Sequence, residues 1–161
     1  MRKAIIALVT LAVFITSSAF ALENSFLDMR SELVDESGKV KELLNKTKKD
    51  LLAVSSMWDT CLITISQIDA YFDLLGLFNS VPEKNLNQES ADCLTKWMAQ
   101  IRKTNDMNIK MLSQMSSIVE PATQSHMQML KDYFQRLNAK IDAEVIKINA
   151  LKMTMNKNAA S

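Results

Sequence analysis

Apolar side chains between residues 33 and 75 recur at alternating steps of four and three residues, and the pattern continues for six heptads. Such steps keep the side chains on one stripe of an α-helix, so the pattern predicts a helix that buries this stripe against other helices. Only two positions of the stripe are polar, Ser37 and Thr47. The stripe consists of Leu33, Ser37, Val40, Leu44, Thr47, Leu51, Val54, Trp58, Cys61, Ile65, Ile68, Phe72 and Leu75.

The first predicted helix covers about residues 24–78. Ser37 and Gly38 are a weak point, because glycine and serine disfavour the interior of a helix. The apolar phase nevertheless passes these two residues without a slip, which favours one continuous helix. Residues 79–88 are polar, contain Pro82 and lack a helical period, so they predict a loop.

Two further helices are predicted in the second half of the chain, at about residues 89–119 and 121–157. Glu120 and Pro121 separate them, and proline is well suited to the first position of a new helix. The apolar phase resets at Pro121, so two helices are favoured over one kinked helix. The third stripe consists of Met127, Leu130, Phe134, Leu137, Ile141, Val145, Ile148, Leu151 and Met155.

These elements predict an all-α fold, an elongated antiparallel three-helix bundle with coiled-coil-like packing, in a single domain of residues 22–161. The two cysteines, Cys61 and Cys93, are 32 residues apart, and in an exported chain they predict one disulfide between the first two helices. That disulfide would place Trp58 beside Trp97 in the core.

The same register leaves two parts of the chain projecting from the bundle. Residues 22–36 extend beyond the turn at Pro121, and the loop after residue 78 runs back along the first helix. Projecting ends are where we expect a protein partner to bind. The predicted contact residues are Phe26, Leu27, Met29, Val81, Leu86 and Gln88.

Residues 1–21 have the pattern of a cleaved signal peptide. Arg2 and Lys3 give a positive start, an apolar run follows, and Ala19-Phe20-Ala21 is the small-residue pattern that a signal peptidase accepts. Cleavage leaves a chain with no later transmembrane segment, so we expect a periplasmic or secreted protein.

Composition and charge exclude several classes of function. Without Arg2 and Lys3 the formal charge falls from +1 to −1, which argues against a nucleic-acid or membrane-surface binder. Two glycines and two prolines are too few for a turn-rich β protein. The chain has one histidine, His126, and no glycine elbow that would accompany a nucleophilic serine, so we expect no enzyme and no cofactor.

Methionine and histidine give one alternative. Across the turn at Pro121, Met115 is expected to lie close to His126, Met127 and Met129, and thioether and imidazole groups are ligands that suit Cu(I). Methionine also commonly fills gaps in helical cores, and packing in the core is the favoured interpretation of these residues.

The leading functional hypothesis is therefore an exported helical-bundle interaction protein, such as an envelope chaperone, an adaptor, or an accessory subunit of a secretion or surface assembly. The alternative is a small-ligand or Cu(I) carrier that uses the Met115, His126, Met127 and Met129 cluster. Self-association is a third possibility, because residues 22–36 could pair with a second copy to form a homodimer.

Overall fold

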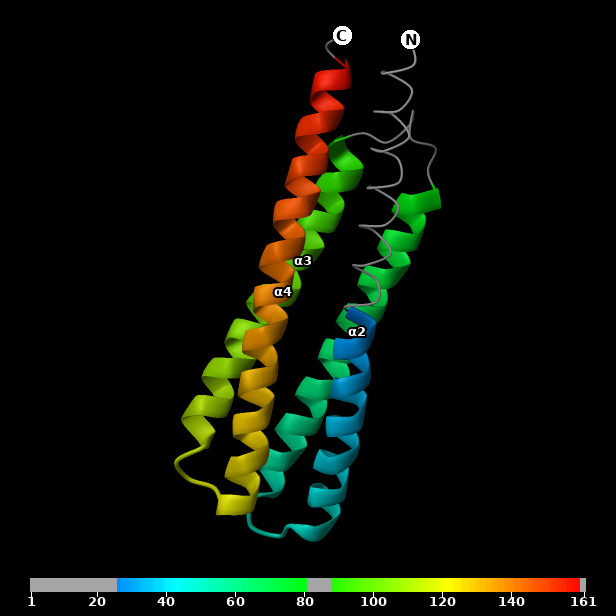
Figure 1. Ribbon diagram of the computed structural model, residues 1–161. Helices are drawn as coiled ribbons and strands as arrows, with labels where there is room; N and C mark the ends of the chain where they lie inside the picture. Colours follow the sequence, from blue (N-terminus) through cyan, green and yellow to red (C-terminus); the bar gives the residue numbers. More distant parts are fainter. Residues whose placement is uncertain (1–25, 81–87, 160–161) are drawn as a thin grey trace.

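The computed structural model describes residues 26–80 and 88–159, and these residues form four helices and no strand (Figure 1). The helices run alternately in opposite directions, so the fold is an up-and-down four-helix bundle. The elements are the first helix (residues 26–46), α2 (Leu51–Ser80), α3 (Gln88–Met115) and α4 (Pro121–Ala159).

The predicted three-helix bundle is wrong because the chain breaks at residues 47–50 and turns back there. The Thr47 hydroxyl accepts a hydrogen bond from the Asp50 N–H at 3.4 Å, and the Asp50 carbonyl accepts from the Val54 N–H at 2.9 Å. Asp50 therefore occupies the N-cap position of α2, which aspartate favours. The weak point at Ser37 and Gly38 does not interrupt the first helix.

Burial of the first helix explains why the chain folds back. Phe26, Met29, Leu33 and Val40 are all buried in the core. Each such side chain stabilises the fold by about 1.5–3 kcal/mol when it leaves water. A straight helix over residues 24–78 would leave this half of its stripe without a neighbour.

The predicted disulfide is also wrong, since Cys61 is a buried free thiol and Cys93 is an exposed one. The register of α2 against α3 is set by two hydrogen bonds of Gln67. Its side-chain Nε2 donates to Thr104 Oγ1 at 3.1 Å, and its backbone carbonyl accepts from Trp97 Nε1 at 3.1 Å. These contacts place Cys61 level with residues 103–110. Cys93 lies at least ten residues nearer the start of α3, a separation of about 15 Å along the helix axis.

The two tryptophans are separated by the same shift of register. Trp97 lies level with Gln67, whereas Trp58 is nine residues nearer the start of α2. Trp58 contacts the first helix through Lys41, whose Nζ is 5.6 Å from the centroid of the indole ring. The expected pairing of the indoles beside a disulfide is therefore not formed.

Polar contacts between α3 and α4 set the register of this hairpin across the turn at Pro121. Asn138 joins the two helices at their middle, where its Oδ1 accepts from Asn105 Nδ2 at 3.0 Å and its Nδ2 donates to Asp106 Oδ1 at 2.8 Å. Two ion pairs in the same register lie nearer the other end of the hairpin, Arg102–Asp142 and Asp92–Lys152.

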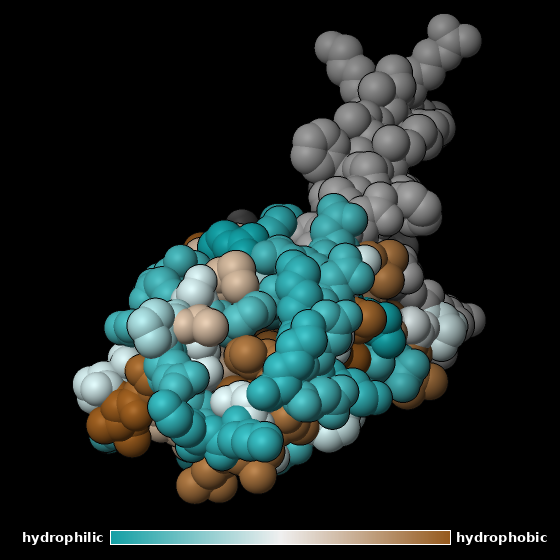
Figure 2. Space-filling model, turned by 90° about the horizontal axis from the view of Figure 1, so that it is seen from below, coloured by the Kyte–Doolittle hydropathy of each residue, from teal (hydrophilic) through white to brown (hydrophobic). Residues whose placement is uncertain are grey.

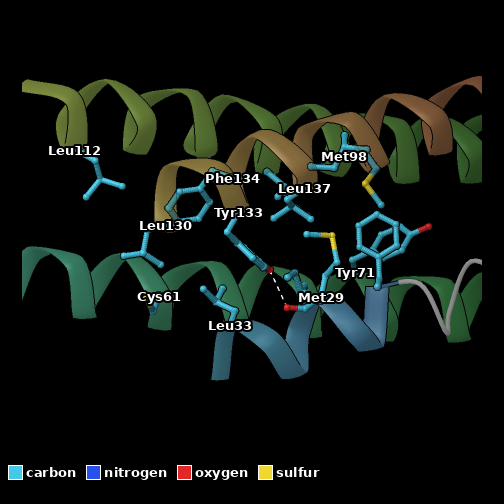
Figure 3. Packing of buried hydrophobic residues seen from close by; sticks show 14 of the residues in the cluster. Met29, Leu33, Cys61, Tyr71, Met98, Leu112, Leu130, Tyr133, Phe134 and Leu137 are labelled. Carbon is cyan, nitrogen blue, oxygen red and sulfur yellow. Dashed lines mark hydrogen bonds between the residues drawn. The ribbon is translucent and has the colours of Figure 1, made fainter. Parts of the chain in front are cut away.

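The core runs along the whole bundle and takes side chains from every helix (Figure 3). Tyr133 of α4 donates its hydroxyl to the Met29 carbonyl of the first helix at 3.0 Å, and the rings of Phe26 and Tyr71 are 5.4 Å apart. The stripe predicted for α4 is buried at Met127, Leu130, Phe134, Leu137, Ile141 and Ile148.

The turns at residues 47–50 and 116–120 lie at the same end of the bundle and are joined there. The Glu120 N–H donates to Asp50 Oδ2 at 2.8 Å, and Lys49 forms an ion pair with the Glu120 carboxylate at 3.0 Å. Figure 2 looks onto this end, which is mostly hydrophilic with apolar side chains at several places along its margin.

Candidate functional site

Four of the residues predicted to contact a partner are described by the structure, and two of these lie in the core while two are exposed. Phe26 and Met29 are 1% and 4% exposed and belong to the core, so residues 26–36 pack against α2 and α4 and do not project. Leu27 is 45% exposed on the outer side of the first helix.

The other predicted contact residues belong to the connection between α2 and α3. Gln88 is exposed at the first position of α3. Val81 and Leu86 lie outside the described residues, as does the predicted signal peptide of residues 1–21.

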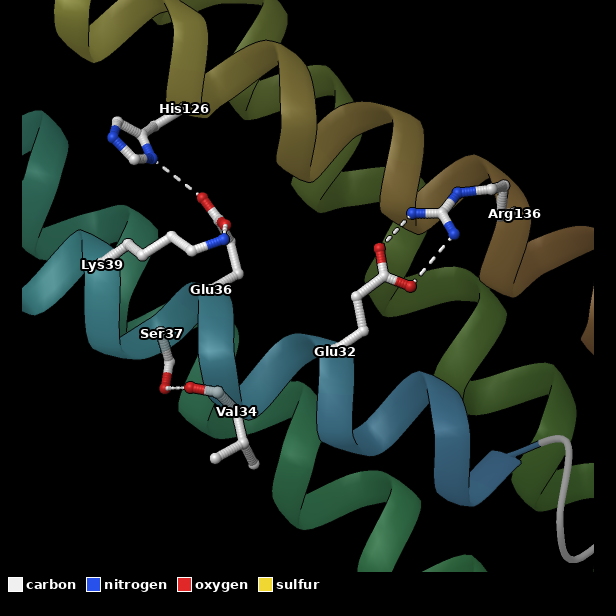
Figure 4. A network of polar contacts seen from close by, with 7 residues as sticks. All are labelled: Glu32, Val34, Glu36, Ser37, Lys39, His126 and Arg136. Atoms are coloured by element: carbon white, nitrogen blue, oxygen red, sulfur yellow. Dashed lines mark hydrogen bonds and ion pairs between the residues drawn. The ribbon is translucent and has the colours of Figure 1, made fainter.

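The methionine and histidine residues proposed for Cu(I) have different surroundings in the structure. His126 Nδ1 lies 2.8 Å from Glu36 Oε1 on the first helix (Figure 4). Met127 is fully buried, whereas Met129, two positions later on α4, is 43% exposed on another side of the helix. Met115 packs against the core. Within residues 26–80 and 88–159, no three His, Cys, Asp or Glu side chains are grouped to hold a metal ion.

The polar side chains between the first helix and α4 hold these two helices together. Glu32 receives two hydrogen bonds from the guanidinium of Arg136, one of them at 3.0 Å (Figure 4). Nearly buried Glu36 bonds to His126 and forms an ion pair with Lys39 at 3.1 Å. The only histidine of the chain therefore has a structural partner.

Burial makes the Cys61 thiol a poor nucleophile. Removal from water, together with the nearby Glu36 carboxylate, raises the pKa of Cys61 to about 12. The thiolate is the reactive form of cysteine, so this side chain stays protonated and inert at neutral pH.

The outer side of α2 differs from the surfaces predicted to bind a partner or a metal, and it is distinguished by its composition. This helix contains three aspartates and no lysine or arginine. Asp69 is paired with Arg30 of the first helix. Asp59 and Asp73 are exposed, and no ion pair to either is formed within the described part of the chain.

Exposed apolar side chains accompany these two carboxylates. Leu62 and Ile63, which are 44% and 52% exposed, follow Asp59 by one helical turn, and Leu52 and Leu77 stand near the two ends of α2. We refer to this surface as the α2 outer face. It consists of Leu52, Asp59, Leu62, Ile63, Ser66, Asp73 and Leu77.

The apolar character of α2 on both sides is also evident from its hydropathy. Within the described residues, Leu51–Phe78 is the one helical segment that is long and apolar enough to cross a membrane, judged by length and composition alone. Only 28% of its most apolar 18-residue stretch is buried. One side of α2 supplies Met57, Ile68 and Tyr71 to the core, so much of the remaining apolar surface faces outward. The predicted stripe of this helix contains none of the exposed apolar residues Leu52, Leu62, Ile63 and Leu77, and the pattern of the sequence gave them no role. The signal of the outer face was the absence of basic residues from 51 to 80.

Comparison of the chain with protein-family models, with curated proteins and with solved structures finds no match. Its function therefore has to be inferred from its own geometry.

Proposed function

We propose that this chain is an exported helical-bundle protein that acts by binding a protein partner and not by catalysis, and that the α2 outer face is its contact surface. One observation carries the proposal: Leu62 and Ile63 are exposed between two unpaired carboxylates, on a helix without a basic residue. An adaptor, a chaperone or an accessory subunit of an envelope assembly would each use such a surface.

The composition of the α2 outer face defines the chemistry of the partner. Exposed apolar side chains supply burial at the centre of a contact, and charged side chains around them select a partner of opposite charge. The matching partner is a helix with an apolar stripe flanked by lysine or arginine. An anionic lipid surface and nucleic acid are disfavoured, because Asp59 and Asp73 would repel both.

Export is proposed from residues 1–21 alone. N-terminal sequencing of the mature protein, recovered from the periplasm or the culture medium, is expected to start at Leu22. A mature chain that retains Arg2 and Lys3 would contradict export by cleavage.

The contact surface is tested with two synthetic amphipathic helices that share one leucine stripe, flanked by lysine in the first peptide and by glutamate in the second. Calorimetric titration is expected to show binding of the lysine peptide only. Replacing both Asp59→Lys and Asp73→Lys should weaken that binding by about tenfold, which corresponds to about 1.4 kcal/mol.

The matched control is the double variant Asp28→Lys, Asp35→Lys, which reverses two exposed carboxylates of the first helix. It makes the same change in net charge and should leave peptide binding unchanged. Equal binding of both peptides, or equal loss in the two double variants, would argue against the α2 outer face as the site.

A further inference from the structure

A row of basic residues follows the exposed side of α3. Lys96, Lys103 and Lys110 are spaced by seven residues, so they lie on one face of the helix, and all three are exposed. None of them forms an ion pair with another residue that the structure describes. Met107, which is 59% exposed, lies one turn before Lys110. We refer to these four residues as the α3 lysine row.

The spacing of the α3 lysine row matches the spacing of the carboxylates on the α2 outer face. Lys96 and Lys110 are fourteen residues apart, as are Asp59 and Asp73, and both separations correspond to about 21 Å along a helix. An antiparallel pairing that sets Asp59 opposite Lys110 also sets Asp73 opposite Lys96.

The same pairing also brings one exposed apolar side chain of each helix together. It sets Leu62, an exposed leucine of α2, opposite Met107, an exposed methionine of α3, and it sets Ser66 opposite Lys103. The lysine row therefore has the partner chemistry that the α2 outer face requires, an apolar residue flanked by cations.

The two surfaces also lie at the same height in one molecule. The contacts of Gln67 place Asp59 level with residues 105–112 of α3, and place Asp73 level with residues 91–98. These ranges contain Lys110 and Lys96. Two copies that stand side by side with parallel bundle axes would therefore bring the two rows together without a shift along the axis.

The distribution of charge between the two hairpins favours the same arrangement. Residues 26–80 contain nine acidic and six basic side chains, whereas residues 88–159 contain seven acidic and ten basic ones. The half that carries the α2 outer face is thus net negative, and the half that carries the α3 lysine row is net positive.

We propose that a second copy of this chain is the partner, with the α3 lysine row of one copy docked on the α2 outer face of the next. This inference rests on the proposed function, since it takes the α2 outer face as the contact surface. The two surfaces differ, so the contact is heterologous and each added copy offers the same two surfaces again. Assembly then continues from copy to copy unless the rotation between copies closes a ring.

Sedimentation velocity of the purified protein over a wide range of concentration tests the proposal. The average mass should rise above that of a monomer as concentration increases. The rise should be smaller at an ionic strength of about 1 M than at about 0.1 M, because salt screens the exposed ion pairs.

Charge reversal identifies the surfaces. The variants Asp59→Lys with Asp73→Lys, and Lys96→Glu with Lys110→Glu, should each stay monomeric alone. A mixture of the two should associate again, because the basic α2 of the first variant meets the acidic α3 of the second. The unchanged α3 of the first variant likewise meets the unchanged α2 of the second. The control Asp28→Lys with Asp35→Lys should associate as the unchanged chain does, and helical circular dichroism verifies that every variant is folded.

A monomer at every concentration, association that survives both reversals, or a mixture that stays monomeric would overturn the proposal. Peptide binding separates this failure from failure of the proposed function. If the chain is monomeric but its α2 outer face still binds the lysine peptide, only self-association is excluded. If peptide binding is also absent, the α2 outer face is excluded as a contact surface.

Discussion

At the scale of single residues, Glu144 is the most enclosed carboxyl group in the described part of the chain, at 1% exposure. One oxygen accepts a hydrogen bond from the Tyr71 hydroxyl at 3.0 Å, and the other is buried without a partner. Burial raises the pKa of Glu144 above its usual 4.5, although the bond from Tyr71 opposes this shift. The charged form is therefore costly in the folded state.

This cost predicts how stability depends on pH. A carboxyl group with a raised pKa binds its proton more tightly in the folded protein than in the unfolded one. The folded state therefore loses stability as pH rises from the usual pKa of 4.5 to the raised pKa of the folded state. Glu144→Gln keeps an acceptor for Tyr71 and removes the charge. Urea denaturation should show the variant more stable than the unchanged chain at neutral pH, and without this advantage below pH 4.5. Equal destabilisation at both pH values would contradict the argument.

The two thiols should differ in reactivity. Cys93 is exposed and should react with a thiol reagent in the folded protein, whereas Cys61 is buried with a pKa raised to about 12 and should react only after unfolding. A colorimetric thiol assay should therefore detect one group under native conditions and two in denaturant. Absence of both groups in unreduced protein would instead indicate the disulfide that the structure lacks.

At the scale of elements, the first helix is expected to be essential to stability because it fills the core. Phe26→Ala should cost about 3–5 kcal/mol, the usual range for a buried phenylalanine. The adjacent Leu27→Ala is the matched control, since this side chain is 45% exposed, and it should change stability by about 0.5 kcal/mol or less. Similar effects of the two substitutions in chemical denaturation would place the first helix outside the core.

The helical class and the α3–α4 hairpin could be predicted from the sequence, because Pro121 interrupts the apolar phase and the stripe that follows it is regular. The turn at residues 47–50 could not be predicted in the same way. Leu44 and Leu51 stand seven residues apart on either side of it, so a straight helix and a hairpin have the same apolar pattern. Thr47 and Asp50, both residues that favour helix N-caps, were the local sign of the break.

The register of α2 against α3 could not be predicted from the two cysteines, because both are free thiols and do not join the helices. The contacts of Gln67 with Trp97 and Thr104 set this register instead. The candidate site was missed for a related reason. Which apolar residues of α2 stay exposed depends on where the first helix and α3 pack against it, and periodicity alone does not supply that information.

At the scale of the whole molecule, the hairpin of the first helix and α2 can be distinguished from a single long helix by one distance. Spin labels at Leu27→Cys and Leu77→Cys, in a chain with Cys93→Ser, should lie within about 30 Å, because both positions are near the same end of two packed helices. A continuous helix would separate them by about 75 Å. Pulsed electron paramagnetic resonance measures distances in this range, and the longer value would exclude the fold.

The bond between Asp50 and Glu120 has a consequence for dividing the chain. It links the two hairpins at the end of the bundle remote from residues 80 and 88. Cutting the chain between those residues would thus leave this link intact. Each hairpin lacks a complete apolar core without the other, and their net charges are opposite. Two fragments synthesised separately should therefore refold only when combined, and would serve as the halves of a complementation reporter.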